Sequence, residues 1–81
     1  MKYIEIEYKI SNENNKEYHM IHFEDENEVS LNMIENGKHA GHIETPLTSN
    51  IKALLKMQQG EQIRNGAGVT ITITKRTEDT L

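Results

Sequence analysis

The sequence predicts an α+β fold: a four-stranded antiparallel meander with one helix packed on one face, followed by a fifth strand (ββββαβ). Three observations predict it. Residues 3–10 alternate apolar and polar side chains, Asn36-Gly37 is a strong hairpin signal, and apolar residues recur at helical spacing over 47–55. Since the chain has 81 residues, we expect one domain over 1–81, with 77–81 as a frayed tail.

The first two strands are expected over residues 3–10 and 17–24, separated by a polar loop. Both segments are rich in the β-branched and aromatic residues that favour strands. A loop centred midway between them places Ile6 opposite Ile21. In this register, Ile21 and Phe23 lie on the same face as the isoleucines of the first strand, and the next turn places Ile21 beside Leu31.

Asn36-Gly37 predicts a second hairpin between strands over 29–34 and 38–44, because both turn residues tolerate positive φ. The turn pairs Glu35 with Lys38, which carry opposite charges. The same register places His42 opposite Leu31, on the face that the helix is expected to cover. One face of the meander is then expected to carry Ile4, Ile6, Tyr8, Ile21, Phe23, Val29, Leu31 and Met33.

A helix is expected to cover that face. Thr45-Pro46 offers an N-cap and a first helical residue, with Ser49 as an alternative cap. An apolar stripe follows at Leu47, Ile51, Leu54 and Leu55, and the helix is expected to end or weaken at Gly60. Strand five is predicted over 69–74, with Val and Ile inward and Thr outward; it pairs with strand one or with another subunit.

The opposite, open face of the sheet is the first candidate binding surface. Two-layer proteins use such half-apolar faces for self-association or ligand capture. The predicted register assigns it eight candidate ligand- or partner-binding residues: Glu5, Glu7, Tyr18, Met20, His22, Ile34, His39 and Thr72.

The histidines form two H-x-x-H patterns, at His19 and His22 and at His39 and His42. On strands, side chains three residues apart point to opposite faces, and the chain has no cysteine. We therefore expect no metal site and no cofactor. Glu5 is expected beside His22 on the open face. That pair is the only acid–base candidate, and an enzyme is our last hypothesis.

The charge is −4 overall, with a balance of −6 over residues 1–44 and +2 over residues 45–81. A broad basic face for nucleic acid is therefore not expected. An acidic docking loop at Glu24, Asp25, Glu26 and Glu28 is read as either a solvated turn or a mimic of nucleic-acid phosphates. An anion site is considered at Arg64, Lys75 and Arg76.

From these features we expect a non-catalytic interaction protein that binds another protein and itself, as a homodimer or larger oligomer. Such size and lack of motifs are common among phage or mobile-element accessory proteins, inhibitors included. The alternatives are a protein that binds or sequesters a nucleotide or other anion at a subunit interface, and an acidic nucleic-acid mimic. No apolar run reaches the ~20 residues of a membrane span, and no signal peptide is visible, so we expect a cytoplasmic protein.

Overall fold

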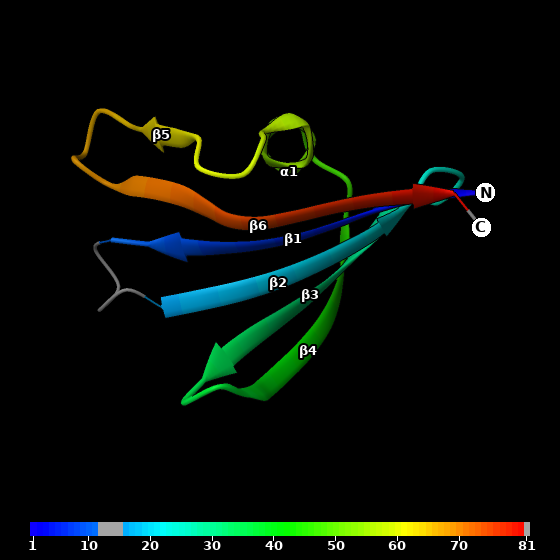
Figure 1. Ribbon diagram of the computed structural model, residues 1–81, viewed down its shortest axis with the longest axis horizontal. Helices are drawn as coiled ribbons and strands as arrows, with labels where there is room; N and C mark the ends of the chain where they lie inside the picture. Colours follow the sequence, from blue (N-terminus) through cyan, green and yellow to red (C-terminus); the bar gives the residue numbers. More distant parts are fainter. Residues whose placement is uncertain (12–15, 81) are drawn as a thin grey trace.

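A six-stranded antiparallel sheet forms the frame of the protein, and one helix packs against one of its faces (Figure 1). The computed structural model describes residues 1–11 and 16–80. Across the sheet the strands follow the order β4-β3-β2-β1-β6-β5. In chain order the elements are β1 (Lys2–Ile10), β2 (Lys16–Phe23), β3 (Glu28–Glu35), β4 (Lys38–Pro46), α1 (Ser49–Lys56), β5 (Gln62–Arg64) and β6 (Thr70–Thr80).

The predicted α+β class, with an antiparallel sheet and one helix, is confirmed, but the ββββαβ order is wrong. A short sixth strand, β5, lies between the helix and the last strand and pairs with β6. This strand was not predicted because its residues are exposed and it is only three residues long. It forms the outer edge of the sheet beside β6 (Figure 1).

The last strand is longer and more central than predicted. β6 pairs with β1 along its length, so the sheet places it beside β1 within the same chain. Residues 77–80, expected in a frayed tail, continue this pairing as far as Lys2 opposite Thr80. Residue 81 lies outside the described residues.

A register shift in β6 changes which of its residues face the helix. Glu7 pairs with Lys75 and Tyr8 with Ile73, so Thr74 is an extra residue between the two pairs. A bulge of this kind reverses the side-chain alternation beyond it. As a result, Arg76 lies opposite Ile6, on the face that α1 covers.

β2 is shifted by one residue from the predicted register with β1. Ile6 pairs with Met20 instead of Ile21. Since side chains alternate along a strand, this shift turns Ile21 and Phe23 to the open face. It brings three other side chains to the covered face: Tyr18, Met20 and His22. Burial agrees, because Met20 is 1% exposed and His22 is 8% exposed, and the predicted faces of β2 are therefore wrong.

β3 nevertheless lies as predicted relative to β1. Met20 pairs with Leu31, again one residue away from the predicted pairing of Ile21 with Leu31. The two one-residue shifts cancel, and Val29, Leu31 and Met33 remain on the covered face. Val29 is fully buried there.

β4 begins in the predicted register and then changes it. Glu35 pairs with Lys38 across the Asn36-Gly37 turn, and both turn residues have positive φ, as the hairpin prediction required. After His39, Ala40 is an extra residue, so Leu31 pairs with Ile43 and not with His42. This bulge moves His42 to the open face, which corrects its predicted position.

The helix begins later than predicted because Thr45 and Pro46 still belong to β4. Thr48 is the N-cap, and its Oγ1 accepts a hydrogen bond from the backbone N–H of Ile51 at 3.4 Å. α1 ends at Lys56, before Gly60. The predicted helix location is right, but its cap and its length are not.

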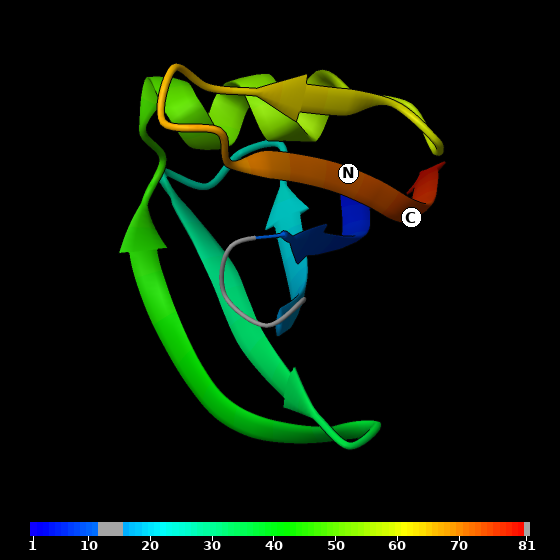
Figure 2. The same ribbon diagram turned by 90° about the vertical axis from the view of Figure 1, so that its left-hand side faces the viewer.

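The core lies between α1 and the middle of the sheet. Among the described residues, four large side chains are less than 2% exposed: Ile6, Met20, Ile73 and Val29. Around them pack the buried Tyr8, Leu55 and Met57, with the partly buried stripe residues Leu47, Ile51 and Leu54. The sheet is strongly bent, and α1 lies over one end of its concave side, so the β3–β4 hairpin extends beyond the helix (Figure 2).

Candidate functional site

A cavity of about 200 Å³ opens between α1 and the end of the sheet where β1 begins. Its apolar lining comes from Ile4 on β1, Leu47 before the helix and Leu55 on the helix. Polar side chains complete it: Lys2, His22, Glu24, Lys52 and Lys56. The site forms because the short helix covers only part of the concave face, leaving apolar surface at the rim.

Two of the cavity lysines are free to meet a ligand. Lys52 and Lys56 lie four residues apart on α1 and therefore on one side of the helix. Within residues 1–11 and 16–80, neither side chain makes a hydrogen bond or ion pair. Because the lining includes a single carboxylate, Glu24, the mouth of the cavity carries an excess of positive charge in a chain that is acidic overall.

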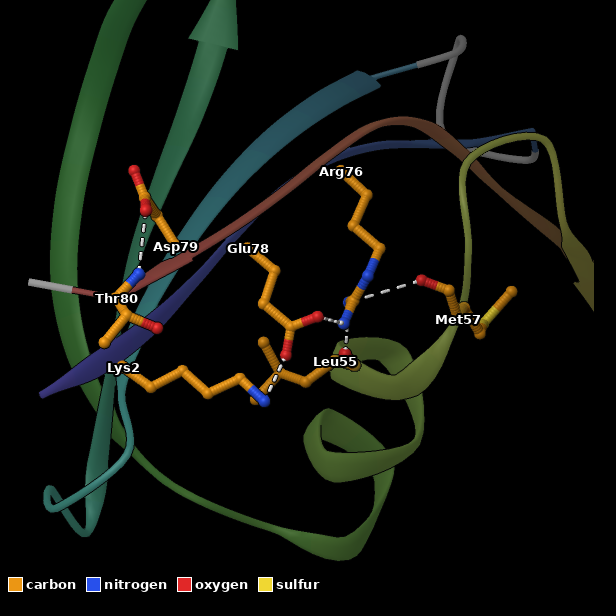
Figure 3. Close-up of polar contacts among 7 residues, drawn as sticks. All are labelled: Lys2, Leu55, Met57, Arg76, Glu78, Asp79 and Thr80. Carbon is orange, nitrogen blue, oxygen red and sulfur yellow. Dashed lines mark hydrogen bonds and ion pairs between the residues drawn. The ribbon is translucent and has the colours of Figure 1, made fainter.

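Lys2, in contrast, is already paired. Its Nζ lies 2.5 Å from Glu78 Oε1, which joins the start of β1 to the end of β6 (Figure 3). This hydrogen bond is the main cause of a raised pKa for Lys2 and of a lowered pKa for Glu78. Lys2 therefore keeps its charge at the cavity but shares it with Glu78.

His22 forms part of the wall of the cavity. Its side chain is on the covered face, and its Nδ1–H donates to the carbonyl oxygen of Glu28 at 3.2 Å. This hydrogen bond leaves Nε2 as the ring atom available to a partner. His22 was predicted on the open face, and the register of β2 explains the difference.

Arg76 fixes the helix that roofs the cavity. Its Nη1 donates to the carbonyl oxygen of Leu55 at 2.5 Å and to that of Met57 at 3.5 Å, and its Nη2 lies 3.4 Å from Glu78 Oε2 (Figure 3). The carbonyl groups at a helix C-terminus lack intrahelical partners, and a cation there is favourable. Arg76 therefore acts as a structural anchor, and its guanidinium is occupied.

The proposed anion residues do not converge. Arg76 lies on the covered face, whereas Lys75 pairs with Glu7 and lies on the open face. Arg64, on β5, donates from Nε to Thr70 Oγ1 at 3.4 Å, at the far end of β6. The structure thus brings none of the three together.

Of the eight residues predicted on the open face, five lie there: Glu5, Glu7, Ile34, His39 and Thr72. The other three, Tyr18, Met20 and His22, face the helix side. Glu5 therefore meets His19 and not His22; His19 Nε2–H donates to Glu5 Oε2 at 2.9 Å. The expected Glu5–His22 pair does not form.

The histidines of the open face make a small cluster. The rings of His19 and His39 stack with centroids 5.6 Å apart. His42 is held by its own strand and by β3, with Nε2 3.1 Å from Glu44 Oε1 and Nδ1 2.9 Å from Asn32 Oδ1. Among the described residues, no group of three or more His, Cys, Asp or Glu is arranged to hold a metal ion.

The glutamates of the acidic loop after β2 line two separate hollows. Glu24 lies at the α1 cavity, whereas Glu26 and Glu28 line a separate shallow hollow together with Glu44 of β4. Asp25 is exposed in the turn between them. The four acids therefore do not form one continuous docking surface.

The α1 cavity was missed by the sequence analysis. Lys52 and Lys56 carried a usable signal, since their i, i+4 spacing beside the apolar stripe places two cations at one edge of the helix. Lys2 and Ile4 carried none, because only the pairing of β1 with β6 and the position of the helix bring them to the same cavity.

Comparisons with known proteins do not place the chain in a family. Within residues 1–11 and 16–80, none of the structure is a helix that could span a lipid bilayer. No family model matches this chain, and no curated protein or solved structure matches it either.

Proposed function

We propose that this chain is a non-catalytic binding protein that recognises another protein through the cavity beneath α1. The partner places one large apolar side chain in the cavity, and an acidic residue beside it meets Lys52 and Lys56. The observation that carries this proposal is the combination of an apolar lining with two lysines that have no partner among the described residues.

The size of the cavity supports a single anchoring side chain. Pockets for drug-sized ligands occupy roughly 300–1,000 Å³, whereas an apolar cavity of roughly 150 Å³ holds one benzene molecule. A volume of about 200 Å³ matches one aromatic or branched aliphatic side chain. Interfaces commonly draw most of their binding energy from a few such anchors in desolvated pockets.

Charge supports an acidic neighbour for that side chain. Lys52 and Lys56 project from α1 at the edge of the cavity, and both are exposed. A carboxylate on the partner would gain from both, while the partner's apolar group displaces water from Ile4, Leu47 and Leu55. Exposed charges of this kind chiefly increase the association rate and select the partner.

Selection from a displayed random-peptide library on the immobilised protein tests the proposal. We expect enriched peptides to share one large apolar residue next to Asp or Glu. A synthetic peptide of that sequence should bind at least tenfold more weakly to Lys52→Glu/Lys56→Glu. The matched control Lys16→Glu/Lys38→Glu, which makes the same charge change at exposed strand ends, should bind normally. Enriched peptides that bind the Lys52→Glu/Lys56→Glu variant as tightly as the wild type would refute the proposal.

The second candidate partner is a small anionic ligand. The cavity volume of about 200 Å³ suits a small anion better than a nucleotide. Phenylacetate carries one ring and one carboxylate, so it is a suitable probe, with phenylacetamide as the uncharged control. Chemical-shift changes at the backbone amides of Ile4, Leu47 and Lys56 with phenylacetate alone, without any enriched peptide, would favour this candidate over a protein partner.

A further inference from the structure

We propose that a second copy of this chain pairs with the free edge of β4, in an antiparallel register centred on Ile43, to give a symmetric dimer. β4 is the outer strand of the sheet (Figures 1 and 2), and it is long, whereas the opposite edge strand, β5, has only three residues. A long edge strand presents unpaired backbone groups to another strand.

The ladder between β3 and β4 shows which backbone groups are free. The N–H of Leu47 donates to the carbonyl oxygen of Asn27 at 3.0 Å, just beyond the pair Glu28–Pro46. Hydrogen-bonded pairs alternate along an antiparallel ladder, so Thr45, Ile43 and Gly41 direct their N–H and C=O groups toward β3. Pro46 fits this pattern. Its backbone nitrogen faces away from β3, so the ladder with β3 needs no N–H there, and proline has none.

His42 and Glu44 therefore direct their backbone N–H and C=O groups away from β3, toward solvent. A symmetric second strand can use these groups only if its own His42 or Glu44 lies opposite one of them. Three symmetric registers satisfy that condition: they centre on His42, Ile43 or Glu44.

Charge and side-chain packing choose among the three registers. Centring on Glu44 places two carboxylates directly opposite each other, which is unfavourable. Centring on His42 pairs Glu44 with Ala40, the extra residue of the bulge. In the register centred on Ile43, His42 of each copy lies opposite Glu44 of the other copy. Each of these two pairs forms both of its backbone hydrogen bonds.

Ile43 supplies the apolar contact at the centre of this register. It is 56% exposed, one of the most exposed large hydrophobic side chains among the described residues. It lies on the concave face beside a hollow of about 150 Å³ lined by Tyr18, Leu31, Met33, Gly41, His42 and Ile43. The two Ile43 residues would form a non-hydrogen-bonded pair, in which side chains approach most closely.

The ends of β4 limit the pairing to this short segment. Lys38 and the bulge at Ala40 interrupt one end, and Pro46 closes the other. Such an interface is at the small end of those that proteins use, so we expect a dimer that dissociates on dilution.

Sedimentation equilibrium over a range of protein concentrations tests the proposal. We expect a monomer–dimer equilibrium whose dissociation constant rises at least tenfold in Ile43→Lys. The matched control is Ile63→Lys, which changes the exposed isoleucine of the other edge strand and should leave the dimer intact. Circular dichroism confirms that both variants fold. A monomer at every concentration would overturn the proposal, and so would a dimer that only Ile63→Lys weakens. In either case a strand of a different protein would be the remaining partner for the β4 edge.

Cross-linking tests the register, since the chain has no cysteine of its own. Ile43→Cys should oxidise to a disulfide-linked dimer, because Cα atoms of non-hydrogen-bonded pairs lie about 4.5 Å apart. Glu44→Cys should not, because the two copies of residue 44 are offset along the strands and their Cα atoms are more than about 7 Å apart. Equal cross-linking of both variants would reject the register.

Discussion

The guanidinium of Arg76 ties β6 to the end of α1 by donating a hydrogen bond to the carbonyl oxygen of Leu55 (Figure 3). The arginine side chain is only 10% exposed, so this hydrogen bond is shielded from solvent. A helix of eight residues has little stability by itself and depends on such tertiary contacts. The roof of the candidate cavity is therefore held in place by a residue outside the cavity.

Replacing Arg76 with Met should destabilise the protein by about 1.5–3 kcal/mol, the range for hydrogen bonds to charged groups. Met keeps much of the aliphatic volume but leaves the carbonyl groups of Leu55 and Met57 without this donor. Urea denaturation followed by circular dichroism gives the free energy of unfolding. The control is Lys75→Met, at an exposed neighbour on the other face. Equal stability of the two variants would contradict the anchoring role.

The Lys2–Glu78 ion pair predicts a pH-dependent contribution to stability. The pKa of Glu78 is lowered in the fold, so its contribution is present above pH 4.5, the ordinary value, and is lost as the pH falls through the folded pKa. The pKa of Lys2 is raised, so its contribution is complete below pH 10.5 and is lost as the pH rises through the folded pKa. The alkaline loss should be partial, because Arg76 also contacts Glu78 and remains charged.

Melting temperatures of the wild type and Glu78→Gln across this pH range provide the measurement. We expect the wild type to be more stable at neutral pH, with the difference shrinking in acid and in strong alkali. Since the pair is exposed, 1 M salt should also reduce the difference. A difference that is constant from acid to alkali would show that the ion pair does not contribute.

The register of β2 predicts unequal effects of two neighbouring substitutions. Met20→Ala should cost about 2–5 kcal/mol, as expected for truncating a fully buried side chain. Ile21→Ala should cost less, because Ile21 lies on the open face and is only partly buried. The free energy of unfolding, measured for each variant, gives the two costs to be compared. A larger loss of stability in Ile21→Ala than in Met20→Ala would support the register in which Ile21 faces the helix.

The β3–β4 turn predicts a cost for a side chain at Gly37. This residue has φ +77°, and a Cβ added there would meet nothing within 4 Å. The cost of Gly37→Ala should therefore come from backbone conformation alone, about 1–2 kcal/mol. Gly66→Ala is the matched control, since Gly66 also has open space but no positive φ, and its stability should be unchanged or slightly raised. Equal unfolding free energies for the two variants would contradict this strain.

The sequence was informative wherever one local signal was sufficient. Alternation identified β1, Asn36-Gly37 identified the β3–β4 turn, and the stripe from Leu47 to Leu55 identified the helix that covers the sheet. Each of these depends on side-chain periodicity or on the φ preference of two residues, which are properties of a short segment. The candidate cavity had only one such signal, the spacing of Lys52 and Lys56.

Local sequence signals were enough to predict the α+β class, the strong hairpin and the apolar stripe of the helix. Three features could be seen only in the folded chain: the faces of β2, the bulges at Ala40 and Thr74, and the cavity at which Lys2, His22 and Lys52 meet. In β2 both alternating sets contain large apolar side chains, so a shift of one residue changes the faces without changing the pattern. The choice therefore depends on contacts between distant segments, such as Met20 with Ile6 and Arg76 with Leu55, which local periodicity does not encode.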